Sequence, residues 1–310
     1  MTIINREKLE SLFTALNMAF KEGLSLAELK PSSISMVVPS STKIEEYPVL
    51  MLLSTIREWI GPRQIQNIAG GKLQIVNKPF EHTIGIPRDD VKDGLIAMFP
   101  MLFKQMGVDA ENLWAVLEIE ALIANGKWID DKAFFVADRK FENSTICNLT
   151  TDALSAASYA AARLMMMQYT NHAGKPMGIV PDTLLVGPAL VATANEIIND
   201  DKVVQSYAAD TDDETVLNHV AKSNPNYKTA TVEMSPLLNG ASANYWFLAK
   251  TKGVTKPVII QKREIGALFA WDTEHDTCVK DFNRNDYGIF RRGSAGLAMP
   301  PWCFGGLTPA

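Results

Sequence analysis

Residues that mark covalent or metal-centred chemistry are scarce in this sequence. Its 310 residues include only three cysteines and four histidines, and no two histidines lie three or four positions apart. Cys147, Cys278 and Cys303 are widely separated, so we expect neither a C-x-x-C pair nor a disulfide framework. This use of cysteine is typical of a chain that folds in a reducing cytoplasm.

An excess of positive charge is also missing. Thirty lysines and arginines stand against 35 aspartates and glutamates, which gives a net charge of −5. A protein that reads DNA sequence usually carries a basic face, so the charge argues against this class. No apolar run approaches the ~20 residues of a membrane span, and the start MTIINREKLE has no apolar signal core. We expect a protein that is made in the cytosol and does not enter a membrane.

The common sequence signatures of catalysis are absent. The sequence has neither a G-x-x-x-x-G-K-[ST] phosphate loop nor a G-x-G-x-x-G fingerprint, and Gly293-Ser294-Ala295-Gly296 has the wrong spacing for a nucleophile elbow. The acidic run 210–214 lacks the spacing and the glycine of a calcium loop, which favours a solvated loop. A nucleophile at Cys147 or Cys303 with a distant histidine stays open, although no local signature supports it. We therefore expect no catalytic residue, no metal and no cofactor.

An amphipathic helix is predicted over residues 5–22, where Asn5 can cap it and Gly23 can end it. Its apolar face consists of Leu9, Leu12, Phe13, Leu16 and Phe20. The following stretch, residues 24–42, carries two prolines and six serines and is expected to be extended. A helix on such an arm packs either on its own body, which periodicity alone favours, or on a neighbouring molecule.

Two strand-like runs flank Gly70-Gly71, which is a hairpin signal. The first run covers 63–69 and the second 72–86, with His82 on the apolar face of the second as a structural histidine. The side chains near the tip are mostly polar and offer little to bury, and an isolated two-stranded ribbon is marginal in water. We therefore expect the ribbon to pack against another part of this chain or against a partner.

The rest of the chain alternates helices and strands. A long helix is predicted from Asp89-Asp90 to Asn125-Gly126, and Pro100 must kink or split it. A second helix is predicted from Thr151-Asp152 to about Thr170, where the methionine run 164–167 is interpreted as core filling. The other expected elements are strands at 133–137, 144–149, 183–186, 229–234, 245–250 and 258–264, a helix at 188–199, and strand-like pieces over 278–304. This order predicts an α+β protein of two units.

Four short motifs in the first third of the chain resemble those of one family. They are Val37-Val38-Pro39-Ser40-Ser41-Thr42, Arg57-Glu58-Trp59-Ile60-Gly61, Asn77-Lys78-Pro79-Phe80-Glu81 and Arg88-Asp89-Asp90. In order and spacing they are similar to the V-V-x-S-S-T, [KR]-E-W-[IV]-G, N-K-x-F-E and R-[DN]-D of the major head subunits of Mu-like phages. The resemblance is dense over residues 33–125 and thin over 145–240, and the stretch 134–140 lacks the family's His-Pro.

The resemblance implies the major capsid protein fold shared by tailed phages and herpesviruses. In that fold, residues 1–33 would form an N-terminal arm, 57–88 an extended loop built as a β-hairpin, and 151–254 the axial domain. The peripheral domain would consist of 34–56, of 89–150 with a long spine helix, and of the C-terminal strands in 255–310. Contacts between subunits are then expected from the arm and the loop, at Leu9, Leu12, Phe13, Leu16, Phe20, Trp59, Arg63, Gly70, Gly71 and Phe80.

The resemblance also implies a function. A protein of this kind is not an enzyme; it assembles as hexamers and pentamers of itself into an icosahedral shell. The shell would form in the host cytoplasm, enclose double-stranded DNA without sequence-specific binding, and become part of the virion. A scaffold protein and a portal would be its partners, and a decoration protein stays open. Two alternatives remain at this stage: a tail or sheath protein that forms rings or tubes, and a soluble α+β enzyme with a scattered site.

Overall fold

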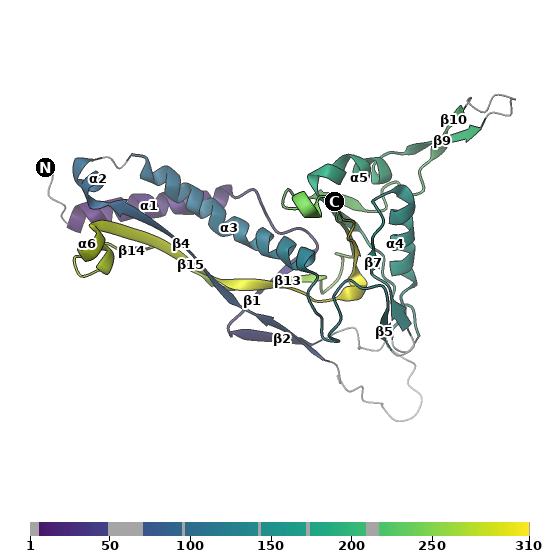
Figure 1. The fold of residues 1–310 in the computed structure, drawn as a ribbon, viewed down its shortest axis with the longest axis horizontal. Helices are drawn as coiled ribbons and strands as arrows, with labels where there is room; N and C mark the ends of the chain where they lie inside the picture. Colours follow the sequence, from purple (N-terminus) through teal and green to yellow (C-terminus); the bar gives the residue numbers. More distant parts are fainter. Residues whose placement is uncertain are drawn as a thin grey trace.

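The computed structural model describes residues 6–48, 71–94, 97–141, 144–171, 174–208 and 217–309. Figure 1 shows a long arm, in which two helices lie along a narrow sheet, and a triangular unit at the other end. Two thin extensions leave this body: a ribbon of β2 (Ile44–Pro48) and β3 (Lys72–Val76), and a hairpin of β9 (Lys202–Ala208) and β10 (Leu217–Ser223). The predicted α+β fold is confirmed.

The arm is built on a five-stranded sheet around the long central strand β15. β13 and β14 follow each other along one side of β15, β4 pairs antiparallel with the other side, and β1 lies parallel to β13. The strands are β1 (Ser35–Pro39), β4 (Lys78–Pro87), β13 (Val258–Ile265), β14 (Phe269–Trp271) and β15 (Arg284–Leu297). The arm therefore joins segments from both ends of the chain.

Helices α1 (Arg6–Leu26) and α3 (Phe99–Ala124) lie along the sheet of the arm (Figure 1). A short helix, α2 (Arg88–Asp93), precedes α3, and Pro100 sits in the first turn of α3, where a proline needs no backbone donor. The predicted split of the long helix is confirmed. So is its end, because Asn125 adopts a left-handed conformation with φ 43°.

Gly23 does not end the first helix, contrary to the prediction. It lies inside α1, where a Cβ atom would overlap the carbonyl oxygen of Lys104 on α3. At the facing position, a Cβ on Gly107 would overlap the carbonyl oxygen of Phe20. The two glycines bring the helix backbones into contact, so the physical reason for Gly23 is close packing, not termination.

The triangular unit contains a second five-stranded sheet in the order β11–β8–β12–β16–β7. Helices α4 (Ala156–Gln168) and α5 (Val191–Ile198) border it (Figure 1). The strands are β7 (Leu149–Thr150), β8 (Thr183–Val186), β11 (Thr231–Met234), β12 (Trp246–Ala249) and β16 (Cys303–Gly306). The predicted boundary at 255 placed all C-terminal residues in the same unit as the arm. Because β16 pairs with β12, at least this strand belongs to the triangular unit instead.

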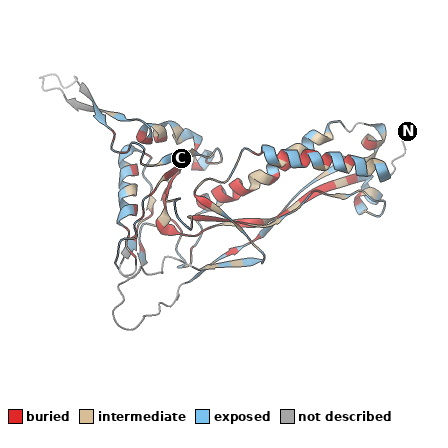
Figure 2. Ribbon diagram, turned by 180° about the vertical axis from the view of Figure 1, so that it is seen from behind, coloured by how far each residue is buried: buried red, intermediate tan, exposed pale blue. Residues whose placement is uncertain are grey.

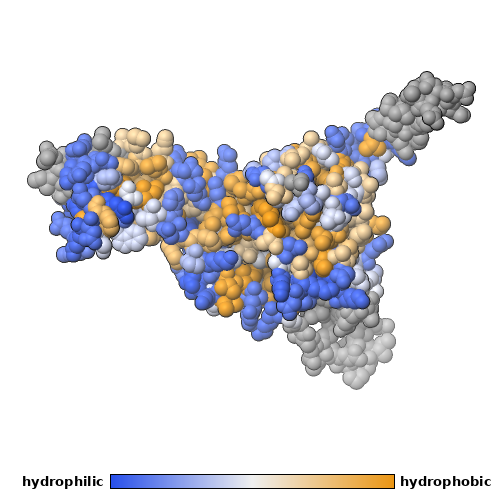
Figure 3. Space-filling view, viewed as in Figure 1, coloured by the Kyte–Doolittle hydropathy of each residue, from blue (hydrophilic) through white to orange (hydrophobic). Residues whose placement is uncertain are grey.

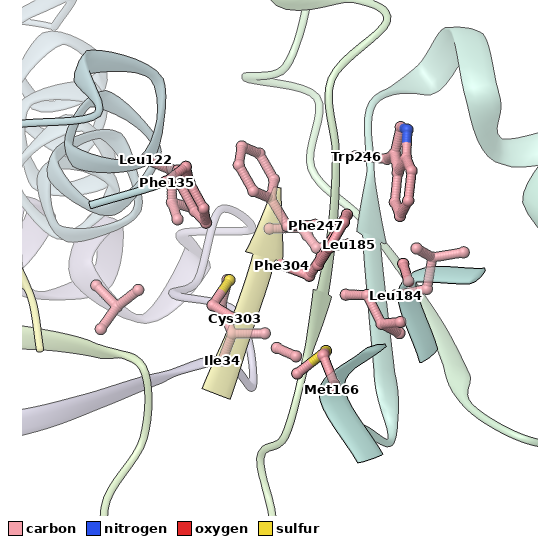
Figure 4. Close-up of a cluster of buried hydrophobic side chains, with 14 of the residues drawn as sticks. Ile34, Leu122, Phe135, Met166, Leu184, Leu185, Trp246, Phe247, Cys303 and Phe304 are labelled. Carbon is pink, nitrogen blue, oxygen red and sulfur yellow. The ribbon is translucent and has the colours of Figure 1, made fainter. Parts of the chain in front are cut away.

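The largest core lies within the triangular unit and reaches the junction with the arm (Figure 4). Phe135 and Phe247 pack with ring centroids 5.5 Å apart, and Trp246 stacks on Phe304 at 5.9 Å. A smaller core joins α1 and α3 to the sheet, where Phe103 meets Tyr287 edge to face at 5.7 Å. Figure 2 shows buried residues along the inner side of both helices and along the sheet.

Several shorter elements differ from the prediction. Residues 133–137 form only an isolated bridge at Ala133, and the strands are β5 (Arg139–Phe141) and β6 (Ser144–Ile146). Helix α4 begins later than predicted, because the hydroxyl of Ser155 caps it by accepting from the N–H of Ser158. The C-terminal strands are preceded by a short helix, α6 (Thr277–Phe282).

The predicted Gly70-Gly71 hairpin needs a correction in its second half. The run 72–86 is divided at Asn77 into β3, which pairs with β2, and β4, which pairs with β15. The described ribbon therefore joins residues 44–48 to 72–76, and its connection is longer than a two-residue turn. The first predicted run, 63–69, lies outside the described residues, as does Gly70.

Candidate assembly surfaces

The β2–β3 ribbon is held to the body on one side only. The hydroxyl of Tyr47 accepts a hydrogen bond of 2.9 Å from Nε2 of Gln261, and Ile75 is buried beside Gly296 on β15. Ile44 and Val76 face each other across the ribbon and remain 43% and 44% exposed. The ribbon thus presents an apolar pair that nothing in the described part of the chain covers.

A salt bridge and a hydrogen bond join the two strands of the ribbon on its exposed face, and they add little to the stability of the subunit. Nζ of Lys72 lies 2.6 Å from Oε2 of Glu46, and Oε1 of the same carboxylate accepts from Nε2 of Gln74 at 3.0 Å. The hydrogen bond from Lys72, followed by that from Gln74, lowers the pKa of Glu46. Because these groups face water, such a pair contributes little to the stability of the fold.

The base of the ribbon is a compact hydrogen-bond network. Asn77 is buried, and its Nδ2 donates to the hydroxyl of Ser40 at 2.7 Å and to the carbonyl of Thr42 at 2.9 Å. A carboxylate oxygen of Glu45 accepts from the N–H groups of Ser41 and Thr42, at 2.9 and 3.0 Å. These bonds, with that of Thr42 the largest cause, lower the pKa of Glu45 to about 2. These hydrogen bonds therefore join the two chain segments that enter the ribbon.

The arm residues expected at subunit contacts divide into two groups. Leu12, Leu16 and Phe20 are buried against α3 and the sheet of the same chain, so in this conformation they do not reach a neighbour. Their burial follows from the close approach of α1 and α3. Helix α1 therefore packs on its own chain, which was the destination that periodicity alone favoured. Leu9 and Phe13 are half-buried and line an open cavity of about 730 Å³ at the outer end of the arm.

The loop residues expected at subunit contacts are placed only in part. Gly71 is exposed, and Phe80 is half-buried beside Leu113 and Arg291 in a cavity of about 230 Å³. Trp59, Arg63 and Gly70 lie outside the described residues. His82, predicted as a structural histidine on an apolar face, lines the same cavity as Phe80 but is exposed and not enclosed in a core. No feature of the described structure gathers the predicted contact residues into one patch.

A junction centred on Glu118 was not predicted. Glu118 lies on α3 and is 1% exposed, and it accepts hydrogen bonds from the N–H of Ser32 at 2.8 Å and from its hydroxyl. The N–H of Ser33 donates to Glu233 on β11 at 2.9 Å. Burial raises the pKa of Glu118 to about 7, the hydrogen bonds from Ser32 oppose this, and the charge of Glu233 adds to it. Two carboxylates thus hold one linker between arm and triangular unit, beside a cavity of about 320 Å³.

A second feature that the sequence reading missed is the outer face of α4. Only Met166 of the methionine run is buried, whereas Leu164, Met165 and Met167 are 55%, 40% and 41% exposed. The interpretation of this run as core filling is therefore wrong for three of its four residues. The signal that could have revealed the face is the scarcity of charge: Arg163 is the single charged side chain on α4.

The described residues offer little for catalysis or metal binding. They contain no group of three or more histidine, cysteine, aspartate or glutamate side chains that could hold a metal ion. Cys278 and Cys303 are buried, and burial raises the pKa of the Cys303 thiol. Within the described ranges, no helix is long and apolar enough to cross a bilayer.

Comparisons with known proteins identify relatives among phage capsid proteins. Residues 9–152 match the family of Mu-like prophage major head subunits, gpT, and residues 86–298 match the phage capsid protein family. The major capsid protein of Escherichia phage Mu is 36% identical over 108 residues, which is 35% of each chain. The Mu-like prophage FluMu major head subunit of Haemophilus influenzae is 27% identical over 161 residues, 49% of this chain and 52% of the relative. The matched stretches thus span about a third and half of these two relatives.

Solved structures of low sequence identity share the fold. The procapsid protein of bacteriophage JBD30 superimposes with a TM-score of 0.57 and 21% identity, over 97% of this chain and 75% of that chain. A subunit of the mature capsid of bacteriophage PhiM1 gives a TM-score of 0.51 and 14% identity, over 89% and 86%. The fold is that of phage capsid proteins. With the family match over residues 86–298, this chain belongs to the phage capsid protein family.

Proposed function

We propose that this chain is the major capsid protein of a tailed phage, and that it assembles as hexamers and pentamers into the icosahedral shell that encloses double-stranded DNA. The observation that carries the proposal is the match of residues 86–298 to the phage capsid protein family. The match of residues 9–152 to Mu-like major head subunits supports the narrower assignment.

The shape of the subunit supports assembly with copies of itself. The β2–β3 ribbon and the β9–β10 hairpin extend away from both cores (Figure 1), where a single chain gives them few contacts. A two-stranded ribbon is marginal alone, so a neighbour that covers Ile44 and Val76 would stabilise it. Many such weak contacts, repeated around a closed shell, add up to a stable particle.

The domain assignment follows the same proposal. The arm unit corresponds to the peripheral domain with α3 as its spine, and residues 151–254 to the axial domain, which also receives β16. The segment between β2 and β3 corresponds to the extended loop, so Trp59, Arg63, Gly70 and Gly71 are proposed contacts with a neighbour. Leu9, Phe13 and Phe80, which a single chain leaves half-buried, are proposed as further contacts.

The chemistry of the chain fits a container rather than an enzyme. A net charge of −5 repels packaged DNA weakly and does not condense it. The protein would assemble in the host cytoplasm and reside in the virion. Its proposed partners are a scaffold protein, a portal and, following the JBD30 capsid that is decorated with minor capsid protein trimers, a decoration protein.

Light scattering during size-exclusion chromatography tests the proposal, with the chain expressed alone and with the scaffold protein of its own phage. We expect species far heavier than the 34.2 kDa subunit in at least one of the two samples. A compact monomer in both would contradict the proposal. Rings or tubes would instead support a tail or sheath protein, and saturable binding of a small molecule by a monomer would support an enzyme.

A further inference from the structure

The outer face of α4 is apolar where a surface helix normally carries charge. Tyr159, Ala162 and Met166 turn towards the core. The opposite side exposes Ala157, Ala160, Ala161, Leu164, Met165 and Met167. A helix that packs on one side only usually has charged or polar residues on the other. The face of α4, visible at the right edge in Figure 3, therefore resembles a surface that is covered in the working assembly.

Arg163 lies at the flank of this face, without a counter-ion among the residues that the structure describes. Its Nε atom is buried and has no hydrogen-bond partner among the described residues, while the residue as a whole is partly exposed. An arginine side chain keeps its proton under all ordinary conditions, so a partly desolvated guanidinium favours an anion beside it. The α4 face thus combines an apolar surface with one cation that has no partner in the described part of the chain.

The outer face of α5 has the complementary composition. Ala194, Ile197 and Ile198 point into the core. Ala192 and Glu196 are exposed on the other side, and Glu196 is the only charged residue of this helix. Exposed Pro188 and Ala189 precede the helix, so the face is again small and apolar with one charge. The single charges of the two helices have opposite signs.

The positions of the two helices suit a contact between copies. Figure 1 shows α4 and α5 along two different edges of the triangular unit, which meet near the corner from which the β9–β10 hairpin projects. Two different patches on two edges produce a heterologous contact, in which each copy offers α4 to one neighbour and α5 to the other. Repetition of such a contact closes a ring when the rotation between successive copies is a whole fraction of a turn.

We propose that the outer face of α4 docks on the outer face of α5 in a second copy of this chain, with Arg163 of one copy beside Glu196 of the next. This inference rests on the proposed function, because it assigns one contact within the rings from which the shell would be built. An α4–α4 contact is disfavoured, since it would bring two Arg163 side chains together.

Charge reversal tests the pairing in the full chain, with its scaffold present. We expect Arg163→Glu and Glu196→Arg each to reduce the assembled fraction by about tenfold or more, and the double variant to restore it to within about twofold of wild type. Lys280→Glu, a matched reversal on α6 at the far end of the arm, should assemble like wild type. Thermal unfolding of the unassembled variants establishes that each one folds. Single variants that assemble normally, or a double variant no better than the singles, would overturn the proposal.

Cross-linking separates this proposal from the proposed function. Under mild oxidation, Leu164→Cys/Ala192→Cys should give a ladder of dimers, trimers and larger species, whereas wild type, with two of its three cysteines buried, should not. A ladder without closed shells would support the α4–α5 contact and count against the capsid assignment. Closed shells without a ladder would support the capsid assignment and overturn the α4–α5 contact. Dimers from Leu164→Cys alone would show an α4–α4 contact and overturn the proposal.

Discussion

Glu118 and Ser32 are joined by two hydrogen bonds although 86 residues separate them in the sequence. The carboxylate is buried on the spine helix α3, and the serine lies in the linker between α1 and β1. The N–H of the next residue, Ser33, donates to Glu233 of the triangular unit. This short linker is therefore hydrogen-bonded to both units of the fold. Several properties of the molecule depend on it.

The stability of the subunit should depend on pH through Glu118. The pKa of this carboxyl is about 7 in the folded chain against an ordinary 4.5, so the folded state holds a proton that the unfolded state loses. The free energy of unfolding should therefore fall as pH rises from about 4.5 to about 7, by about 3 kcal/mol at 1.36 kcal/mol per pKa unit, and then level off. Chemical denaturation between pH 4.5 and 8 measures this.

Glu118→Gln should remove that part of the pH dependence, because an amide does not ionise. At pH 8 the variant should be as stable as wild type or more so, while at pH 4.5 the two should be similar. Glu120→Gln, an exposed position on the same helix, is the matched control and should behave like wild type. Equal pH dependence in wild type and Glu118→Gln would contradict the assignment.

The crossing of α1 and α3 should not tolerate a side chain at Gly107. A methyl group there would overlap the backbone of α1, so Gly107→Ala should cost about 1–3 kcal/mol of unfolding free energy. Gly126→Ala is the control, since a Cβ atom at Gly126 meets nothing within 4 Å. Urea unfolding of both variants gives the comparison, and a Gly107→Ala protein as stable as the control would show that the helices separate easily.

Asn148 should be essential for the packing of β16. It is fully buried, and its Nδ2 atom donates to the carbonyls of Phe134, Pro300 and Cys303 at 3.0, 3.2 and 3.2 Å. Asn148→Ala leaves these buried carbonyls without this donor and should lower the unfolding free energy by about 2 kcal/mol or more. Asn239→Ala, at an exposed position, should change the thermal midpoint little. Equal midpoints would contradict this role.

The ribbon should matter for assembly more than for folding. Ile44→Thr/Val76→Thr replaces an exposed apolar pair with side chains of similar shape, so the unfolding free energy should stay within about 0.5 kcal/mol of wild type. The assembled fraction, measured by sedimentation, should fall, because a neighbour would lose apolar contact. Lys43→Gln, exposed in the same segment, is the control. Normal assembly of the double variant would show that this face of the ribbon stays in solvent.

The sequence predicted those elements whose signals are local. The long helical region was predicted from the acidic start at Asp89-Asp90, the stop at Asn125-Gly126 and a break at Pro100, and β8 because 183–186 is a short apolar run before Gly187-Pro188. The assignment of the whole fold came from the motif resemblance, which the family matches confirm.

The errors arose where distant segments decide the structure. In the sequence alone, Gly23 has the signal of a helix end, and only its contact with α3 near Gly107 shows that it lies inside α1. Residues 72–76 have the signal of a local hairpin at Gly70-Gly71, but their strand β3 pairs with β2. The junction at Glu118 depends on a serine far away in sequence, so no spacing could reveal it. The α4 face was missed because methionine suits both a core and a contact surface.

Electron microscopy of the purified chain, alone and with its scaffold protein, tests the central claim most directly. The account predicts closed, hollow shells of uniform diameter in at least one sample, with capsomers resolved as rings of six and five. A field of dispersed subunits in both samples would contradict it.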